Sequence, residues 1–209
     1  MVTELARQVA HVVADVPVIL TSPLYRSLHL TWGATPSEAS APMPGDGLVP
    51  GAQYRTTRAV TIDAPPWAVW PWLVQVGCGR AGFYSDDLLD NLGRPSARHV
   101  QLDWQLLEVG QWVSMSPMAP NETTAFKVDG FSDQEWLLWR KPDSTWSWVL
   151  HDLGDGRTRL VTRVHALYDW SHPATALFGV LLMELGDFAM MRRMLLGIRE
   201  RAEELAARP

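Results

Sequence analysis

The stretch from residue 173 to residue 206 constrains the fold of this chain more than any other part of the sequence. Its apolar side chains recur at steps of three or four residues, at Leu177, Leu181, Leu185, Phe188, Met191, Leu195, Ile198, Ala202 and Leu205. That spacing places them on one face of an α-helix, while arginines and glutamates occupy the opposite face. We interpret Gly186 as a break and Asp187 as the N-terminal cap of a long final helix. The rest of the chain must therefore supply an apolar surface that covers this stripe.

The chain has 209 residues and no Ser- or Gly-rich linker, so we expect one domain with an N-terminal extension. We expect residues 1–50 to form a helical and extended segment packed on a domain of residues 51–209. Residues 3–20 have helical periodicity. Residues 31–52 are rich in Pro, Gly, Ser and Ala, which predicts an extended crossing segment without an element of its own.

Residues 54–62 alternate and carry β-branched side chains, so they predict a strand. The Pro65-Pro66 pair stops this strand and opens a helix that extends to Val76. Because a proline is tolerated only in the first turn of a helix, Pro71 favours a start near residue 69 or 70. A second short helix is predicted over residues 85–92, with Ser85 as its cap.

The segment beyond Arg98 is rich in residues that favour β-strands. Five runs rich in β-forming residues follow one another, separated by turn signals such as Lys141-Pro142-Asp143 and Asp155-Gly156. These runs predict hairpin-linked antiparallel strands. The order of strand, two helices, several strands and C-terminal helices indicates an α+β fold, in which one curved antiparallel sheet wraps around the long C-terminal helix.

Four phrases of the sequence together resemble bacterial members of a known superfamily: VTIDAPPWAVWPWLVQVG, GRAGFYSDDLLDNLG, GRTRLVTRV and GDFAMMRRMLLGIRERAE. That superfamily is the START/Bet v 1-like one, also called SRPBCC or polyketide-cyclase-like, and the resemblance covers residues 32–206. It implies a helix-grip fold, in which the sheet grips the C-terminal helix around an apolar cavity. Members of the wider superfamily bind or transform lipids, sterols, polyketides and hormones.

The composition excludes several classes of partner. The 18 Lys and Arg residues stand against 23 Asp and Glu residues, so a net charge of −5 offers no basic surface for nucleic acid or an anionic membrane. The single cysteine, Cys78, excludes an intramolecular disulfide and a Cys-rich zinc site, and it favours a cytoplasmic location. Residues 176–198 do not predict a membrane span, because charged side chains such as Glu184 and Arg192 would be placed in hydrocarbon.

No motif of the sequence assigns a catalytic residue, a metal or a cofactor. Residues 77–82 fit GxGxxG, but a strand should lead into a dinucleotide-binding motif, and here a helix is predicted instead. Arg80 in this turn is interpreted either as a holder of an acid group or as a solvated side chain. Cys78 has no assignable base nearby. The six histidines show no metal-ligand spacing, so we expect no metal site and no bound cofactor.

Eleven tryptophans are many for this length, and most of those beyond residue 100 fall on predicted strands. They indicate either ordinary packing or an aromatic lining for an apolar ligand, with methionines of the last helix completing it. Alternation in the last strand points Thr162 at the helix and leaves Arg163 and His165 on the other face, either solvated or as a buried polar pair.

We expect a small hydrophobic molecule, such as a lipid, a polyketide or an aromatic metabolite, to bind between the sheet and helix 187–206. The predicted ligand-binding residues are Tyr84, Trp112, Trp136, Trp148, Thr162, Met191 and Leu195. An error of one residue in strand register would turn a lining tryptophan outward. Two alternatives stay open: a cyclase- or hydratase-like enzyme using Tyr84, Asp103 or His165 as acid or base, and a protein-interaction module without a ligand. The oligomeric state is left open.

The first testable prediction concerns the glycine-rich turn. NAD, NADP and FAD should not bind, because the helix that contains Trp70 and Trp72 occupies the place of the strand that such a site needs. Titration calorimetry with each dinucleotide checks this expectation. Saturable binding at micromolar concentration that is lost when Gly79 is replaced by a bulky residue would show that residues 77–82 are a dinucleotide-binding motif after all.

Overall fold

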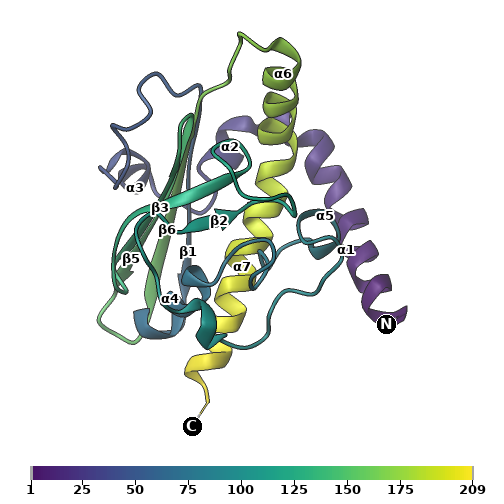
Figure 1. Cartoon of the computed structure of the whole chain (residues 1–209). Coiled ribbons are helices and arrows are strands. Elements are labelled where there is room, and N and C mark those ends of the chain that lie inside the picture. The colour runs from purple at the N-terminus through teal and green to yellow at the C-terminus, as the bar shows by residue number, and fades with distance from the viewer. Residues whose placement is uncertain (1, 209) are drawn as a thin grey trace.

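The computed structural model describes residues 2–208 and places a six-stranded antiparallel sheet against a long C-terminal helix (Figure 1). The order of strands in the sheet is β1 (Tyr54–Ile62), β6 (Thr158–Ala166), β5 (Ser144–Asp152), β4 (Trp136–Lys141), β3 (Ala125–Ser132) and β2 (Trp112–Ser114). The strands from β2 to β6 follow one another as a meander, and β1 pairs with β6 over its whole length. The predicted α+β helix-grip fold is confirmed.

Two layers of helix lie on one side of this sheet, and the short helix α3 (Pro36–Ser40) lies on the other side. The final helix consists of α6 (Pro173–Leu181), a π-helical turn (Leu182–Gly186) and α7 (Asp187–Ala206), and α7 crosses the sheet while α1 (Val2–Thr21) lies on the far side of α7 (Figure 1). The shorter helices are α2 (Arg26–Leu30), α3 (Pro36–Ser40), α4 (Pro66–Val74) and α5 (Asp87–Asp90), with 3₁₀ turns at Ser22–Tyr25 and Leu102–Trp104. None of the helices within residues 2–208 combines the length and apolar character that a membrane crossing requires.

We call the face of the sheet that meets α7 the inner face. Cross-strand pairing aligns Trp139 with Trp146, and Trp148 with both Leu137 and Thr162. Residues directly opposite one another share a face, so these side chains lie on the same side of the sheet as Arg58, which contacts α7. The inner face and α7 together bury the main apolar core.

The opposite face, the outer face, is covered by the segment of residues 33–48. The guanidinium of Arg163 donates to Asp46 at 2.7 Å and to the carbonyl oxygens of residues 38, 39 and 41. Arg159 forms an ion pair with Glu38 at 2.7 Å. Arg163 and His165 are therefore buried, and of the two predicted alternatives the solvated one is wrong. The covering segment satisfies their polar groups with its own carbonyl and carboxylate oxygens.

Three local predictions for helices need correction. The crossing segment does contain a helix, α3, because Thr35 and Glu38 form a reciprocal capping box at its start. Helix α4 begins at Pro66, where a proline suits the first turn, and Pro71 therefore lies inside the helix, which ends at Val74. Ser85 does not cap α5, because its hydroxyl donates to the carboxylate of Asp90 instead.

The predicted break at residues 186 and 187 is also wrong. The helix continues through the π-helical turn, and Asp187 points into the protein, where it accepts hydrogen bonds from the Tyr54 hydroxyl at 2.7 Å and from Arg58 Nη1 at 2.6 Å. Arg58 is fully buried, so it requires a counter-charge more than the helix requires a cap. Arg58 Nε also donates to the carbonyl oxygen of His29 at 2.8 Å, which ties α2 to the same ion pair.

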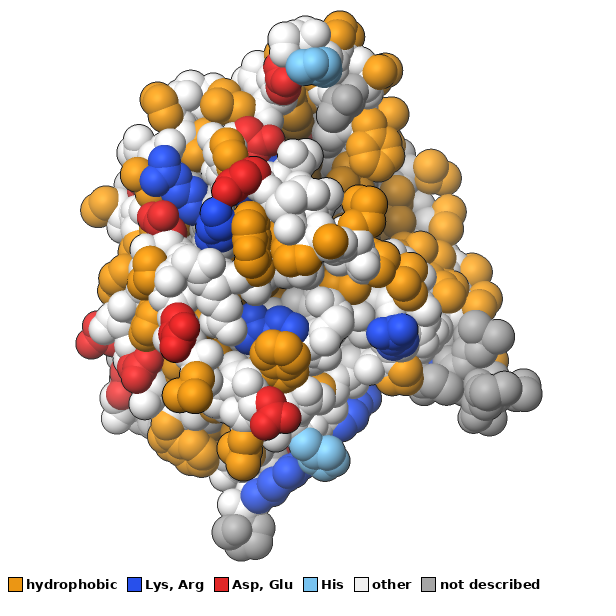
Figure 2. Space-filling view, in the orientation of Figure 1, with side chains coloured by type: hydrophobic (Ala, Val, Ile, Leu, Met, Phe, Trp, Pro, Cys, Tyr) orange, Lys and Arg blue, Asp and Glu red, His pale blue; other side chains and the backbone are white. Residues whose placement is uncertain are grey.

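Part of the helical layer leaves apolar side chains in solvent. Figure 2 shows hydrophobic side chains gathered on the side of the molecule where α1 and α6 lie. Among the side chains of these two helices that the structure describes, the most exposed large apolar ones are Val13, Leu20 and Phe178. The outer side of this layer is thus uncovered along both helices.

The second prediction tests the buried ion pair. Replacing Asp187 with Ala leaves the Arg58 guanidinium buried without a counter-charge, so we expect a loss of about 3–5 kcal/mol in the free energy of unfolding. Urea denaturation followed by circular dichroism measures it. The matched control is Glu200→Ala, which removes an exposed ion pair with Arg98 and should change the same quantity by about 1 kcal/mol or less. Equal losses in the two variants would contradict this role for Asp187.

Candidate functional site

Three tryptophans from two strands form a cluster at the centre of the inner face. The ring centroids of Trp139 and Trp146 are 5.2 Å apart, those of Trp146 and Trp148 are 5.1 Å apart, and those of Trp139 and Trp148 are 5.9 Å apart. Trp146 Nε1 donates to Thr162 Oγ1 at 2.9 Å, and that hydroxyl donates in turn to the carbonyl oxygen of Ser147 at 2.9 Å. The hydroxyl of Thr162 therefore holds Trp146 in place.

Several buried donors around this cluster have no acceptor within residues 2–208. They include the indole N–H groups of Trp139, Trp148 and, on α4, Trp72. Each of these side chains is almost wholly buried within the same core as Met191 and Leu195. Buried N–H groups normally have a partner, and leaving one without a partner costs about 1–3 kcal/mol. The unpartnered tryptophan atoms are all donors, so an acceptor is what this region lacks.

Arg80 lies in the glycine-rich turn and also has buried donors without an acceptor. One of its terminal nitrogens donates to the carbonyl oxygen of Val74 at 2.9 Å, and the guanidinium lies 4.7 Å from the ring centroid of Trp104. Its Nε and the other terminal nitrogen are buried, with no acceptor in the described part of the chain. Burial lowers the pKa of Arg80. The solvated alternative for this side chain is therefore wrong.

The glycine-rich turn itself is closed by its own backbone. Gly77 and Gly82 exchange two hydrogen bonds of 3.1 Å, directly after α4, so no strand leads into the motif. The nearby thiol of Cys78 borders a pocket of about 220 Å³, and burial raises its pKa, which disfavours the thiolate that a nucleophile needs. Within residues 2–208, no set of three or more His, Cys, Asp or Glu side chains is arranged to hold a metal ion.

The structure brings together some of the predicted ligand-binding residues and separates others. Trp148, Thr162, Met191 and Leu195 are all buried between the inner face and α7. Trp112 and Trp136 lie on the outer face instead, which corrects their predicted orientation. Trp112 pairs with Lys127 and stacks against its ammonium group at 4.3 Å, whereas Trp136 packs over Gly130. The register of β2 and β4 differs by one residue from the one that the prediction required.

Tyr84 lies beside α7 and is tied to both α4 and α7. Its hydroxyl donates to the carbonyl oxygen of Trp72 at 3.0 Å, and its ring lies 4.7 Å from the guanidinium of Arg201. The backbone of Tyr84 has a φ of 59°, in the left-handed region that non-glycine residues rarely adopt. Gly197 permits this close approach, because a Cβ there would collide with the carbonyl oxygen of Tyr84. Burial raises the pKa of Tyr84.

The three residues proposed for acid–base catalysis do not meet at one site. Tyr84 lies beside α7, and His165 is on the outer face of the sheet, where burial lowers its pKa. Asp103 is exposed in a 3₁₀ turn. Tyr84 and His165 are on opposite sides of the sheet and Asp103 is exposed, so the geometry does not assemble the three into an acid–base site.

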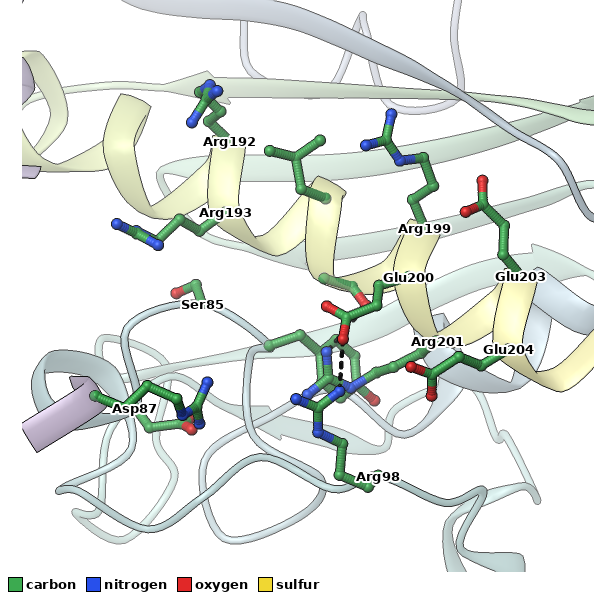
Figure 3. A pocket seen from close by; sticks show the side chains of 14 residues that line it. Ser85, Asp87, Arg98, Arg192, Arg193, Arg199, Glu200, Arg201, Glu203 and Glu204 are labelled. Atoms are coloured by element: carbon green, nitrogen blue, oxygen red, sulfur yellow. Dashed lines mark hydrogen bonds and ion pairs between the residues drawn. The ribbon is translucent and has the colours of Figure 1, made fainter. Parts of the chain in front are cut away.

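A polar pocket of about 540 Å³ lies between α7 and the segment of residues 84–98, on the side of α7 away from the sheet (Figure 3). We call it the arginine pocket. Its lining residues are Arg7, Tyr84, Ser85, Asp87, Arg98, Arg192, Arg193, Leu196, Gly197, Arg199, Glu200, Arg201, Glu203 and Glu204. No motif of the sequence indicates this pocket, although the periodicity does predict the charged face of the final helix.

A cluster of carboxylates borders the arginine pocket at its α1 end. Arg193 forms ion pairs with Asp15 of α1 and, at 3.4 Å, with Asp86. Burial raises the pKa of Asp86 to about 6 and that of Asp90 to about 7, and the neighbouring carboxylate of Asp87 adds to both effects. These groups therefore bind protons more tightly in the folded chain than in the unfolded chain.

The third prediction follows from these pKa values. A carboxyl whose pKa is raised on folding contributes stability that is present below its unfolded pKa, about 4, and lost as the pH rises through its folded pKa. Replacing Asp90 with Asn removes that loss, so the variant should gain stability over the parent as the pH rises from about 4 to about 7, by on the order of 2 kcal/mol at the top of this range.

Urea unfolding at several pH values measures the difference between the two proteins. The exposed Asp133, replaced by Asn, is the control and should show no such trend. A difference for Asp90→Asn that does not change with pH would show that ionisation of this carboxyl has no part in it.

No protein-family model and no curated protein matches the sequence. Among solved structures, a polyketide-cyclase-like protein of Corynebacterium glutamicum is similar, with 16% identity and a TM-score of 0.37 over 73% of this chain and 89% of that chain. The self-sacrificing resistance protein CalC of Micromonospora echinospora has 11% identity and a TM-score of 0.42 over 74% of this chain and 97% of that chain.

CalU16 of Micromonospora echinospora is a third similar structure, with 17% identity and a TM-score of 0.33 over 73% of this chain and 86% of that chain. Because all three TM-scores are below 0.5, we assign the fold from the strand order of this chain and from the position of its own C-terminal helix. On those grounds the chain has the helix-grip fold that its resemblance to the START/Bet v 1-like superfamily implies.

Proposed function

We propose that this protein binds a small apolar molecule that carries oxygen acceptors, between the inner face of the sheet and α7. The observation that carries the proposal is the set of buried indole N–H groups without an acceptor, on Trp72, Trp139 and Trp148. A carbonyl or carboxylate oxygen on the ligand would satisfy donors that the chain itself leaves without partners.

The composition of the surrounding core supports an apolar ligand. The cluster of Trp139, Trp146 and Trp148 offers flat aromatic surfaces, and Met191 of α7 is buried in the same core. Ligand sites are mostly apolar with a few placed polar groups, and methionine adapts to varied shapes. Polyketides and aromatic metabolites, whose rings carry oxygen substituents, have the chemistry that such a lining selects.

Arg80 supports an acidic variant of the same ligand. Its two unpartnered nitrogens are donors of a planar guanidinium, which suits a carboxylate in a bidentate arrangement. The turn of residues 77–82 holds this side chain beside α4, the helix that also carries Trp72. A ligand with an acid group at one end and rings at the other would therefore meet both kinds of donor.

Binding is favoured over catalysis by the state of the ionisable groups on the inner face. Arg58 and Asp187 form an ion pair with each other, and the Tyr54 hydroxyl donates to the same carboxylate. Burial and that carboxylate raise the pKa of Tyr54. The Tyr54 hydroxyl is therefore not poised to exchange a proton with a ligand near neutral pH.

The fourth prediction uses a matched pair of flat aromatic compounds, 9-fluorenone and fluorene, which differ by one carbonyl oxygen. We expect saturable quenching of tryptophan fluorescence by fluorenone, with an affinity roughly tenfold higher than that of fluorene, because only the ketone accepts an indole hydrogen bond. A fatty acid and a sterol, titrated in parallel, test the other ligand shapes.

Three variants locate the site. Trp148→Phe keeps an aromatic ring but removes one donor, so the preference for the ketone should fall. Trp136→Phe, on the outer face, is the matched control and should leave that preference unchanged. Leu195→Trp places a larger side chain between α7 and the sheet and should abolish binding. If no compound gives saturable quenching, or if the first two variants behave alike, the proposed site is wrong and the interaction-module alternative gains support.

A further inference from the structure

The arginine pocket is lined mainly by charged side chains. Six arginines and four carboxylates line it, and one of the arginines, Arg193, forms ion pairs with Asp15 and Asp86 outside this lining. In Figure 3, Arg98 from the segment 84–98 and Arg201 from α7 meet beside Glu200. Arg98 Nη1 donates to Glu200 Oε1 at 2.8 Å. At this point the carboxylate of Glu200 is already bonded to Arg98, and Arg201 lies beside this pair.

Arg201 is the member of this group that lacks a counter-charge. It is 94% buried, since only 6% of its surface is exposed. Its Nε donates to the carbonyl oxygen of Ala97 at 2.9 Å, and Nη1 donates to that of Gly197 at 3.0 Å. Within residues 2–208, no carboxylate lies at ion-pair distance from this guanidinium. Burial and the neighbouring charge of Arg98 lower its pKa, which reflects the cost of leaving a buried cation without an anion.

Other carboxylates of the pocket are bonded elsewhere. Asp87 Oδ1 accepts a hydrogen bond from the hydroxyl of Ser96, and Glu203 Oε1 accepts one from the backbone N–H of Asp63 at 3.0 Å. These bonds hold Asp87 against the segment 84–98 and Glu203 against the end of β1. Neither carboxylate forms an ion pair with Arg201.

The floor of the pocket is held in a fixed shape before any ligand arrives. Tyr84 adopts its left-handed backbone conformation against Gly197, and its ring supports the guanidinium of Arg201 from one side. Backbone strain of this kind persists only where the surrounding structure determines it, and it concentrates at binding sites. The guanidinium of Arg201 is thus held in one orientation within the pocket.

We propose that the arginine pocket binds a phosphate group, held by Arg201 and Arg98. Arg201 is a buried guanidinium without a carboxylate at ion-pair distance, Arg98 lies beside it, and planar guanidiniums bind phosphate oxygens in bidentate fashion. This site is separate from the apolar site of the proposed function, because α7 lies between them, and it does not depend on that function.

The fifth prediction is that this pocket binds inorganic phosphate and pyrophosphate. Titration calorimetry with each compound, at constant ionic strength, tests it. We expect saturable binding that weakens about tenfold in Arg98→Gln and at least as much in Arg201→Lys, because each loses charge-assisted hydrogen bonds. Arg98 is exposed, so its variant should fold even if the buried Arg201 does not tolerate change. The control Arg140→Gln removes one arginine from an exposed site on β4 and should bind as the parent does.

Two arms separate the sources of the phosphate group. Phosphatidylcholine vesicles with and without phosphatidic acid are sedimented with the protein. Binding of inorganic phosphate or pyrophosphate supports a soluble ligand, and binding only to the vesicles with phosphatidic acid supports a lipid headgroup, provided that Arg98→Gln weakens either one. The proposal is overturned if neither probe binds, or if Arg140→Gln weakens binding as much as Arg98→Gln.

Discussion

A single buried ion pair, between Arg58 of β1 and Asp187 of α7, sets the arrangement of the rest of the molecule. The guanidinium also contacts the Tyr54 hydroxyl and the carbonyl oxygen of His29, so strand, final helix and N-terminal segment meet at one charge. An uncompensated charge is far costlier in the interior than a displaced apolar contact. This pair therefore fixes the rotation of α7, and with it which side chains meet the sheet and which meet solvent.

That rotation gives α7 two chemically different sides. One side places Met191 and Leu195 against tryptophans whose N–H groups lack acceptors, and the other places Arg201 over Tyr84 in a pocket rich in guanidiniums. Both sides carry donors in excess of acceptors. The helix thus separates the region proposed for an oxygen-bearing apolar molecule from the region proposed for a phosphate group.

The sequence was sufficient for the fold because the stripe of the final helix and the hairpin signals act over short distances. It failed where a long-range partner decides the outcome: the Gly186-Asp187 pair has the pattern of a cap, but Arg58, 129 residues away, binds the aspartate. The face of the sheet on which each tryptophan of β4 and β5 lies could have been predicted from the sequence. The turn at Pro142-Asp143 aligns Lys141 with Ser144, and this alignment places Trp139 opposite Trp146 and turns Trp136 outward. The arginine pocket could not be predicted from the sequence, since Arg98 and Arg201 meet only through tertiary structure.

The π-helical turn of residues 182–186 has a consequence for how this chain tolerates evolutionary change. Each residue of an α-helix turns the chain by about 100°, so one residue more or fewer before α7 would swing Asp187 away from Arg58. Apolar residues in this turn are free to exchange with one another, but its length is not free to vary. Surface hairpins such as Gly154-Asp155-Gly156 carry no such constraint, and we expect insertions and deletions among homologues to accumulate there instead.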